Sequence, residues 1–103
     1  MRIGRDRFRD VVLRQLELFE QENTALIRDC EQALATYNAA PADEAEARYE
    51  RFLDLAETGR DELAALRDAY RRTLEPEVAE EYEASFNRLV RKRLPRFALE
   101  IEL

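Results

Sequence analysis

Apolar side chains recur along the first third of the chain at alternating steps of four and three residues. The column runs through Phe8, Val12, Leu16, Phe19, Asn23, Leu26, Cys30, Ala33 and Tyr37. This spacing places its members on one face of an α-helix and is typical of helices that pair lengthwise. The pattern therefore predicts a long helix over residues 5–37, in which Ile27 and Leu34 lie on a flanking column.

A second column with the same spacing follows a short interruption. Pro41 disfavours helix at the residue before it, so the first helix is expected to end there. The second column is formed by Ala45, Tyr49, Phe52, Ala56, Gly59, Leu63, Leu66, Tyr70 and Thr73. It predicts a helix over residues 43–74, with Leu53 beside the column. Two helices of similar length joined by a short loop fold back on each other as an antiparallel hairpin.

Within this second helix, Gly59 leaves two alternatives open. A glycine inside a helix costs about 1 kcal/mol relative to alanine, and Thr58 followed by Asp61 favours a restart, so the helix is predicted either to kink there or to continue unbroken. In the unbroken alternative, the missing side chain lets the opposing helix approach closely.

A shorter third helix is predicted over residues 76–94. Pro76 suits the first turn of a helix, where its missing N–H is not needed, and Pro95 ends the pattern. At roughly 1.5 Å per residue this helix covers little more than half of the hairpin. We therefore expect the half nearest the loop to stay uncovered. The apolar residues expected to form an interface there are Ile27, Leu34 and Leu53.

The last residues, 95–103, change to a period of two. Phe97, Leu99 and Ile101 alternate with other residues, which is typical of a strand and predicts a short extended tail. A lone strand cannot satisfy its own backbone, so the tail is expected to pair with another strand, to lie along the hairpin or to form a helical turn. The same three side chains are further interface candidates.

Composition supports a single all-α domain spanning residues 1–103, a three-helix, coiled-coil-like bundle. The chain is 46% hydrophobic and 39% charged, and its two glycines and three prolines leave little material for the many turns of a β-protein. No apolar stretch reaches the roughly 20 residues that span a bilayer, and the first residues lack a signal-peptide core. Together with a single cysteine, Cys30, this predicts a cytoplasmic protein.

The residue types needed for catalysis are poorly represented. The chain has no histidine, which removes the commonest general base and metal ligand. Its carboxylates fall on the outer helix faces, and Cys30 falls on the apolar column, where a thiol behaves as a small hydrophobic group. We therefore expect no enzyme activity, no metal and no cofactor.

Asn23 is the most informative polar residue because it occupies a core position of the first column. A buried asparagine at such a position commonly fixes helix register and the number of partners. The alternative is that Asn23 lies at the edge of the core near solvent. The four tyrosines, which also lie on columns, favour core packing over the lining of a ligand cavity; they are Tyr37, Tyr49, Tyr70 and Tyr82.

The net charge of −6 is distributed unevenly. Residues 15–87 carry seven basic and nineteen acidic groups, whereas residues 88–96 carry five basic groups and no acid. The predicted basic patch is formed by Arg88, Arg91, Lys92, Arg93 and Arg96. Basic segments from Arg2 to Arg14 and from Arg88 to Arg96 define the alternative function, a regulator that binds nucleic acid. The acidic body and the absence of a recognisable nucleic-acid-binding motif disfavour it.

The sequence as a whole predicts a binding protein. We expect a small cytosolic adaptor, regulator or assembly subunit that presents helices to a protein partner. The expected partner is first of all a second copy of the same chain, in a homodimer formed through the exposed hairpin residues, with a second protein as a further partner. Nucleic acid and membrane are not expected partners.

Overall fold

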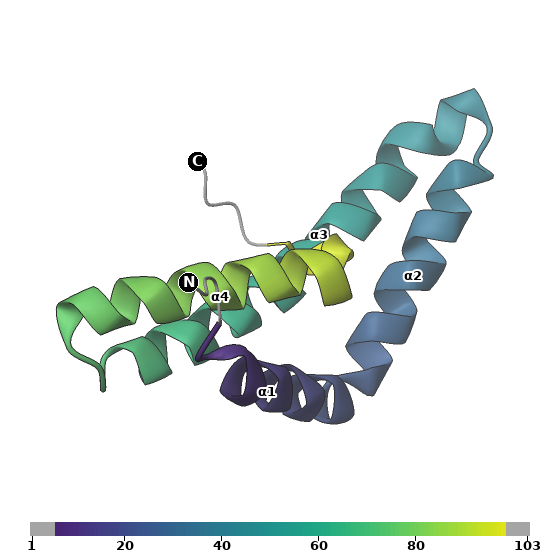
Figure 1. Cartoon of the computed structure of the whole chain (residues 1–103). Helices are drawn as coiled ribbons and strands as arrows, with labels where there is room; N and C mark the ends of the chain where they lie inside the picture. The colour runs from purple at the N-terminus through teal and green to yellow at the C-terminus, as the bar shows by residue number, and fades with distance from the viewer. Residues whose placement is uncertain (1–5, 99–103) are drawn as a thin grey trace.

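The computed structural model describes residues 6–98, and this range is all-helical (Figure 1). It contains no strand, which confirms the predicted all-α class. The elements are α1 (Arg9–Glu22), α2 (Thr24–Asn38), α3 (Ala42–Arg71), α4 (Pro76–Arg93) and the short 3₁₀ turn η1 (Pro95–Phe97). The Cα trace extends over 54 × 27 × 20 Å, so the molecule is elongated.

The structure divides the predicted first helix at Asn23, so the prediction of one unbroken helix over residues 5–37 is wrong. Asn23 has φ −125° and ψ 34°, outside the helical region. Its Nδ2 donates to the carbonyl of Phe19 at 3.0 Å, and the hydroxyl of Thr24 donates to the carbonyl of Glu20 at 3.1 Å. Side chains of this kind compete for backbone groups and favour bends and helix ends, and two of them stand side by side here.

Because of this bend, α1 turns away from the line of α2 and packs against α4 (Figure 1). The ring of Phe8, just before α1, meets the ring of Tyr82 edge-on at 5.5 Å. The Tyr82 hydroxyl donates to Oε1 of Gln15 at 2.8 Å. Arg93 at the end of α4 pairs with Glu20 at 2.7 Å. The first apolar column therefore serves two different partners, α4 before the bend and α3 after it.

Helix α3 runs without interruption for 30 residues and forms an antiparallel pair with α2 (Figure 1). Gly59 lies inside it and does not interrupt it, so the unbroken alternative holds. A Cβ atom at this position would stand 2.5 Å from the ring of Phe97. The missing side chain thus admits an aromatic ring from η1, where the sequence predicted the close approach of a helix.

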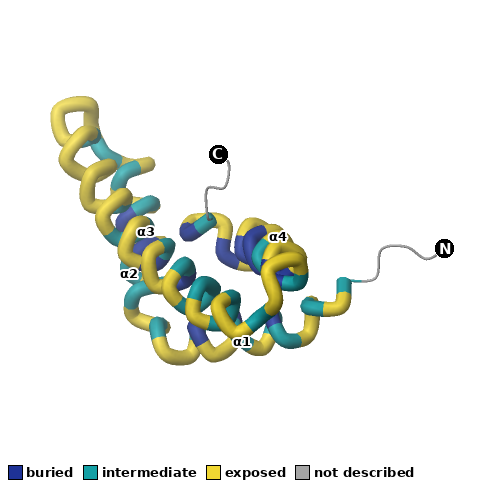
Figure 2. Tube along the Cα trace, turned by 90° about the vertical axis from the view of Figure 1, so that its left-hand side faces the viewer, coloured by how far each residue is buried: buried dark blue, intermediate teal, exposed yellow. Residues whose placement is uncertain are grey.

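The hydrophobic core lies where α1, α4, η1 and the first half of α2 meet the second half of α3 (Figure 2). Its largest fully buried side chains are Tyr82, Phe86, Leu16, Leu63, Val12, Val90 and Cys30. At roughly 25 cal/mol per Å² of buried apolar surface, aromatic and leucine side chains of this size dominate the stability of a small domain. The body of the molecule is therefore defined by this core, and the loop end of the hairpin lies outside it.

The described part of the tail is a 3₁₀ turn, so the helical-turn alternative holds for Pro95–Phe97 and the extended conformation is wrong there. Pro95 fixes its own φ at a value that suits a helical turn. The turn directs Phe97 inward, where it is 2% exposed and meets the ring of Phe19 edge-on at 6.1 Å. Leu99 and Ile101 lie outside the described residues.

Asp6 links the segment before α1 to α4. Its Oδ1 accepts a hydrogen bond from the backbone N–H of Phe8 at 3.0 Å, and its Oδ2 accepts one from the Ser85 hydroxyl at 2.7 Å and pairs with Arg88. Burial raises the pKa of Asp6, but the hydrogen bonds from Ser85 and Phe8 and the charge of Arg88 outweigh it, so the pKa lies below its ordinary value.

This lowered pKa predicts a contribution to acid sensitivity. Because the folded pKa of Asp6 is below the unfolded one, its stabilising effect is present above the unfolded pKa of about 3.9 and is lost as the pH falls through the folded pKa. In Asp6→Asn, the melting temperature is therefore expected to fall less steeply with pH below about 4 than in the wild type. Thermal denaturation across that pH range measures the slope.

The exposed Asp10 on α1, which forms no ion pair within residues 6–98, gives the control. Asp10→Asn is expected to keep the wild-type slope. Equal slopes for the wild type and Asp6→Asn would contradict the role assigned to the Asp6 carboxylate.

Candidate protein-docking surface

The loop end of the α2–α3 hairpin projects from the body as an arm, defined here as residues 30–58 (Figure 1). The two helices are held together mainly by small residues on their facing sides. Cys30 and Ala33 of α2 are buried, and Ala45 and Ala56 of α3 are half-buried. Small side chains allow the two backbones to come close. Two of the larger apolar side chains of the arm, Tyr49 and Leu53, are left exposed.

A continuous apolar and aromatic surface lies on one side of the arm. This arm face is formed by Leu34, Tyr37, Tyr49, Phe52 and Leu53. The rings of Tyr37 and Tyr49 have centroids 4.9 Å apart, and those of Tyr49 and Phe52 6.1 Å, so aromatic side chains connect α2 with α3. Tyr49 is 42% exposed and Leu53 is 37% exposed. Both helices therefore contribute to a single surface that solvent reaches.

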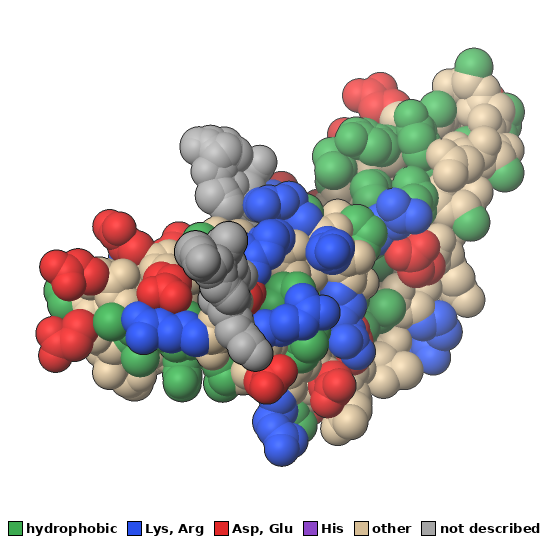
Figure 3. Space-filling view, in the orientation of Figure 1, with side chains coloured by type: hydrophobic (Ala, Val, Ile, Leu, Met, Phe, Trp, Pro, Cys, Tyr) green, Lys and Arg blue, Asp and Glu red, His purple; other side chains and the backbone are tan. Residues whose placement is uncertain are grey.

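The space-filling view shows hydrophobic side chains gathered on the arm, whereas the visible part of the body carries many charged side chains (Figure 3). Leu18 on α1 is the remaining large apolar side chain that is clearly exposed within residues 6–98. Isolated exposed leucines are common on soluble proteins, whereas clustered aromatic and aliphatic side chains usually mark a binding surface. The arm face is the strongest candidate site on this criterion.

The predicted interface residues are distributed over three environments. Leu53 is exposed and Leu34 is half-buried, and both belong to the arm face. Ile27 is half-buried against the core and lines a cleft beside Pro95 and Phe97, so the bend at α1 and the turn η1 cover it in part. Phe97 is a core residue. The three hairpin residues therefore do not form one column.

The sequence places Tyr37, Tyr49 and Phe52 on the inner columns. In the structure Tyr37 and Phe52 are half-buried, Phe52 against the core, whereas Tyr49 is exposed. The inner column near the loop is otherwise made of small residues, as in Ala33 and Ala45. Two helices that approach closely over alanines leave little room for a further large ring between them, so the Tyr49 ring lies at the flank. The change from large to small residues along one column is the sequence signal that could have indicated this exposure.

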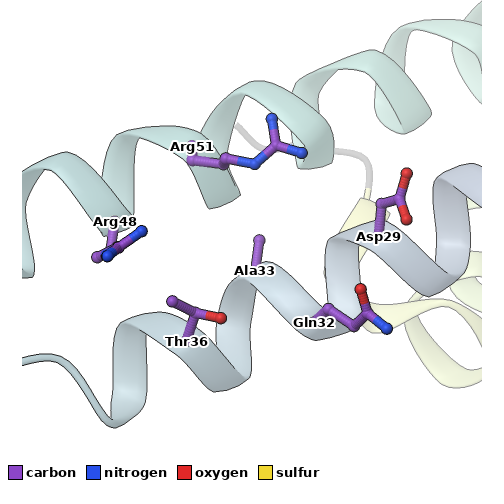
Figure 4. A pocket seen from close by; sticks show the side chains of 6 residues that line it. All are labelled: Asp29, Gln32, Ala33, Thr36, Arg48 and Arg51. Carbon is purple, nitrogen blue, oxygen red and sulfur yellow. The ribbon is translucent and has the colours of Figure 1, made fainter.

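A cleft of about 160 Å³ opens on the α2–α3 hairpin (Figure 4). Ala33 lies at its floor, Arg48 and Arg51 come from α3, and Asp29, Gln32 and Thr36 come from α2. Arg48 is paired with Glu44 at 3.0 Å. This mixture of donors and one acid suits hydrogen bonds to polar side chains at the border of an interface, and it offers no nucleophile or paired catalytic carboxylates.

The predicted basic patch is largely neutralised by neighbouring acids. Arg93 pairs with Glu20 at 2.7 Å and Arg96 with Glu31 at 3.1 Å, while Arg88 pairs with Asp6. Hydrogen bonding to Glu20 raises the pKa of Arg93, against a smaller lowering by burial, so its charge is held in the pair. These contacts bind α4 and η1 to the rest of the body.

Arg91 and Lys92 are the two members of the patch that are exposed and form no ion pair within residues 6–98.

The Asn23 side chain is half-buried at the bend between α1 and α2, where its Nδ2 donates a hydrogen bond to the backbone carbonyl of Phe19. Arg2 lies outside the described residues, whereas Arg14 is exposed on α1.

The buried Cys30 thiol and Tyr82 hydroxyl lie among packed core side chains. Burial raises the pKa of the Cys30 thiol, and the Glu31 carboxylate raises it further, against a smaller lowering by Arg96. A raised pKa disfavours the reactive thiolate. Burial also raises the pKa of Tyr82, against a smaller lowering by its hydrogen bond to Gln15. Both groups are therefore in their neutral forms near pH 7.

The four tyrosines do not surround a common cavity. Tyr70 packs on Tyr82 in the body at 4.8 Å, whereas Tyr37 and Tyr49 lie together on the arm. Across residues 6–98, no three Cys, Asp or Glu side chains are grouped so that they could hold a metal ion. Within the same range, no helix has both the length and the apolar run that crossing a membrane requires.

Comparisons of this chain with protein-family models, with curated proteins and with solved structures gave no match.

Proposed function

We propose that this chain is a non-enzymatic helical protein–protein interaction module, a small cytosolic adaptor, regulator or assembly subunit, whose docking surface is the arm face. Its first partner in this proposal is a second copy of the same chain, in a homodimer. The observation that carries the proposal is the exposure of connected aromatic and aliphatic side chains on an arm that projects from a well-packed body.

The physical argument rests on area and on rigidity. Tyrosine and phenylalanine each remove a large apolar surface from water when they are covered, and tyrosine is enriched among the residues that dominate binding energy. The arm face is presented by α2 and α3, and α3 continues without interruption into the core of the body. The side chains are thus held in position before binding, which reduces the entropy lost on association.

The alternative, a regulator that binds nucleic acid through its basic segments, has less support. Phosphate groups would have to compete with the carboxylates that already pair with Arg88, Arg93 and Arg96. The arm has seven acids and only two basic residues, so its net negative charge would also repel a polyanion. Binding of DNA or RNA that weakens steeply with salt would favour this alternative.

Leu53→Glu is expected to weaken self-association at least about tenfold, because it replaces an apolar side chain of the contact with a carboxylate that must be desolvated. Leu53 is on the surface of the monomer, so the fold is expected to persist. Sedimentation velocity over a range of concentrations, together with circular dichroism, measures both quantities.

Leu18→Glu gives a matched control, since Leu18 is 49% exposed and lies on α1 away from the arm. It is expected to associate like the wild type. A wild-type chain that stays monomeric at all concentrations would sink the homodimer part of the proposal, and equal effects of the two substitutions would sink the assignment to the arm face.

A further inference from the structure

We infer that two copies of this chain pair reciprocally, so that the acidic stripe of each arm lies against Arg91 and Lys92 of the other copy. This inference rests on the proposed function and specifies its partner and orientation. Its basis is that two surfaces of the same molecule carry opposite charges and do not contact each other within one chain.

An acidic stripe borders the arm face along α3. Glu46, Glu50 and Glu57 follow one another at steps of four and seven residues, which places them on one side of the helix. Tyr49 and Leu53 occupy adjoining positions by the same spacing. All three glutamates are exposed, and Glu46 and Glu50 form no ion pair within residues 6–98. The apolar contact surface therefore has an acidic border.

The charges of the arm and of the end of α4 are opposite and equal in size. The arm, residues 30–58, contains seven acids and two basic residues, for a net charge of −5. Residues 88–96 contain five basic groups and no acid, for a net charge of +5. Since three of those five are already paired, Arg91 and Lys92 remain to meet an acidic partner.

Within one chain these two surfaces do not neutralise each other. The contact between the arm and the basic patch is made by Glu31 and Arg96, at the base of the arm on α2. Among the described residues, none of the ion pairs joins Glu46 or Glu50 to Arg91 or Lys92. Glu46, Glu50, Arg91 and Lys92 are therefore free to pair with charges of a second copy.

Both surfaces are open to solvent, because Glu46 and Glu50 on the arm and Arg91 and Lys92 at the end of α4 are all exposed. Figure 3 shows basic side chains gathered where the body meets the arm, on the side where the hydrophobic side chains of the arm are also visible. A two-fold axis brings a surface patch of one copy against a second patch of its partner and repeats that contact in reverse. Two copies facing each other in this way would form the arm-to-body contact twice.

The test uses two charge-reversed variants of the full chain. The arm variant carries Glu46→Arg and Glu50→Arg, and the patch variant carries Arg91→Glu and Lys92→Glu. Each variant alone faces like charges at both contacts, so its self-association is expected to weaken about tenfold or more. Mixed in equal amounts, the two variants restore opposite charges at both contacts, and the heterodimer is expected to recover the wild-type affinity.

Sedimentation velocity with a fluorescent label on one variant measures homodimers and heterodimers separately. Glu62→Arg with Glu80→Arg is the matched control, because it makes the same change of charge at exposed positions of the body. This control is expected to associate like the wild type and not to recover the patch variant.

The outcomes separate this inference from the proposed function. If the mixture associates no better than either variant alone, or if both variants dimerise like the wild type, the arm-to-body orientation is wrong. A simultaneous loss of dimerisation in Leu53→Glu would then leave the arm face in place as the docking surface with another arrangement. A monomeric wild type would overturn both.

Discussion

Replacing Gly59 with alanine is expected to destabilise the fold, although the same substitution ordinarily stabilises a helix by about 1 kcal/mol. The new methyl group would stand 2.5 Å from two atoms of the Phe97 ring and 2.8 Å from its Cγ. Cγ lies near the root of the side chain, so the ring cannot avoid the contact by moving its far end. Forcing a buried ring aside costs about 1–3 kcal/mol. Urea denaturation measures the free energy of unfolding.

Phe97→Ala provides the background that tests this explanation. Truncation of this buried ring is expected to cost about 3–5 kcal/mol by itself. In that background the methyl group of Gly59→Ala meets no ring, so the second substitution is expected to become neutral or stabilising. The double-mutant cycle thus reverses the sign of one substitution. A stabilising effect of Gly59→Ala in the wild type would show that Phe97 does not occupy this site.

Leu16→Ala is expected to destabilise the protein by about 2–5 kcal/mol, whereas Leu18→Ala is expected to change the stability by less than about 0.5 kcal/mol. The two leucines are two positions apart on α1 and lose the same side-chain atoms. Leu16 is 0% exposed in the core with Tyr82 and Phe86, and Leu18 is 49% exposed. Their common helix propensity cancels in the comparison, so the difference reports burial alone.

Urea denaturation of both variants gives the free energies, and circular dichroism checks that the helix content is kept. Similar costs for the two substitutions would mean that α1 does not present Leu16 to the core. That result would contradict the packing of α1 against α4.

Much of the helical architecture follows from local patterns in the sequence. The prolines at positions 41, 76 and 95 mark boundaries that the helices respect within one or two residues, because proline restricts its own φ and the residue before it. The columns likewise identify Val12, Leu16 and Leu63 as core residues. These signals are carried by neighbouring residues, so a single sequence is sufficient to read them.

The partners of each helix could not be predicted in the same way. A column of alternating steps specifies that Val12, Leu16 and Phe19 share a face, but it does not specify which helix covers that face. The bend depends on hydrogen bonds made by Asn23 and Thr24, whose side chains are also compatible with a continuous helix. Tertiary packing therefore decides whether the helix breaks at Asn23, and the spacing of apolar residues carries no information about that packing.

The same reason applies to the candidate site. The sequence predicted an exposed apolar surface near the loop and named Leu34 and Leu53 as part of it. It did not predict that Tyr49 would be exposed, because that depends on how closely α2 and α3 approach. Phe97 was assigned to an interface, and a gap opposite Gly59 makes it a core residue instead.

The continuity of α3 has a mechanical consequence. One end of this helix is embedded among the side chains of the body, and its other end carries the arm, with no hinge between them. Moving the arm relative to the body would require breaking consecutive backbone hydrogen bonds of a single helix. The stiffness of α3 therefore sets the angle between arm and body. Any molecule that binds the arm is therefore held at a defined orientation to the body.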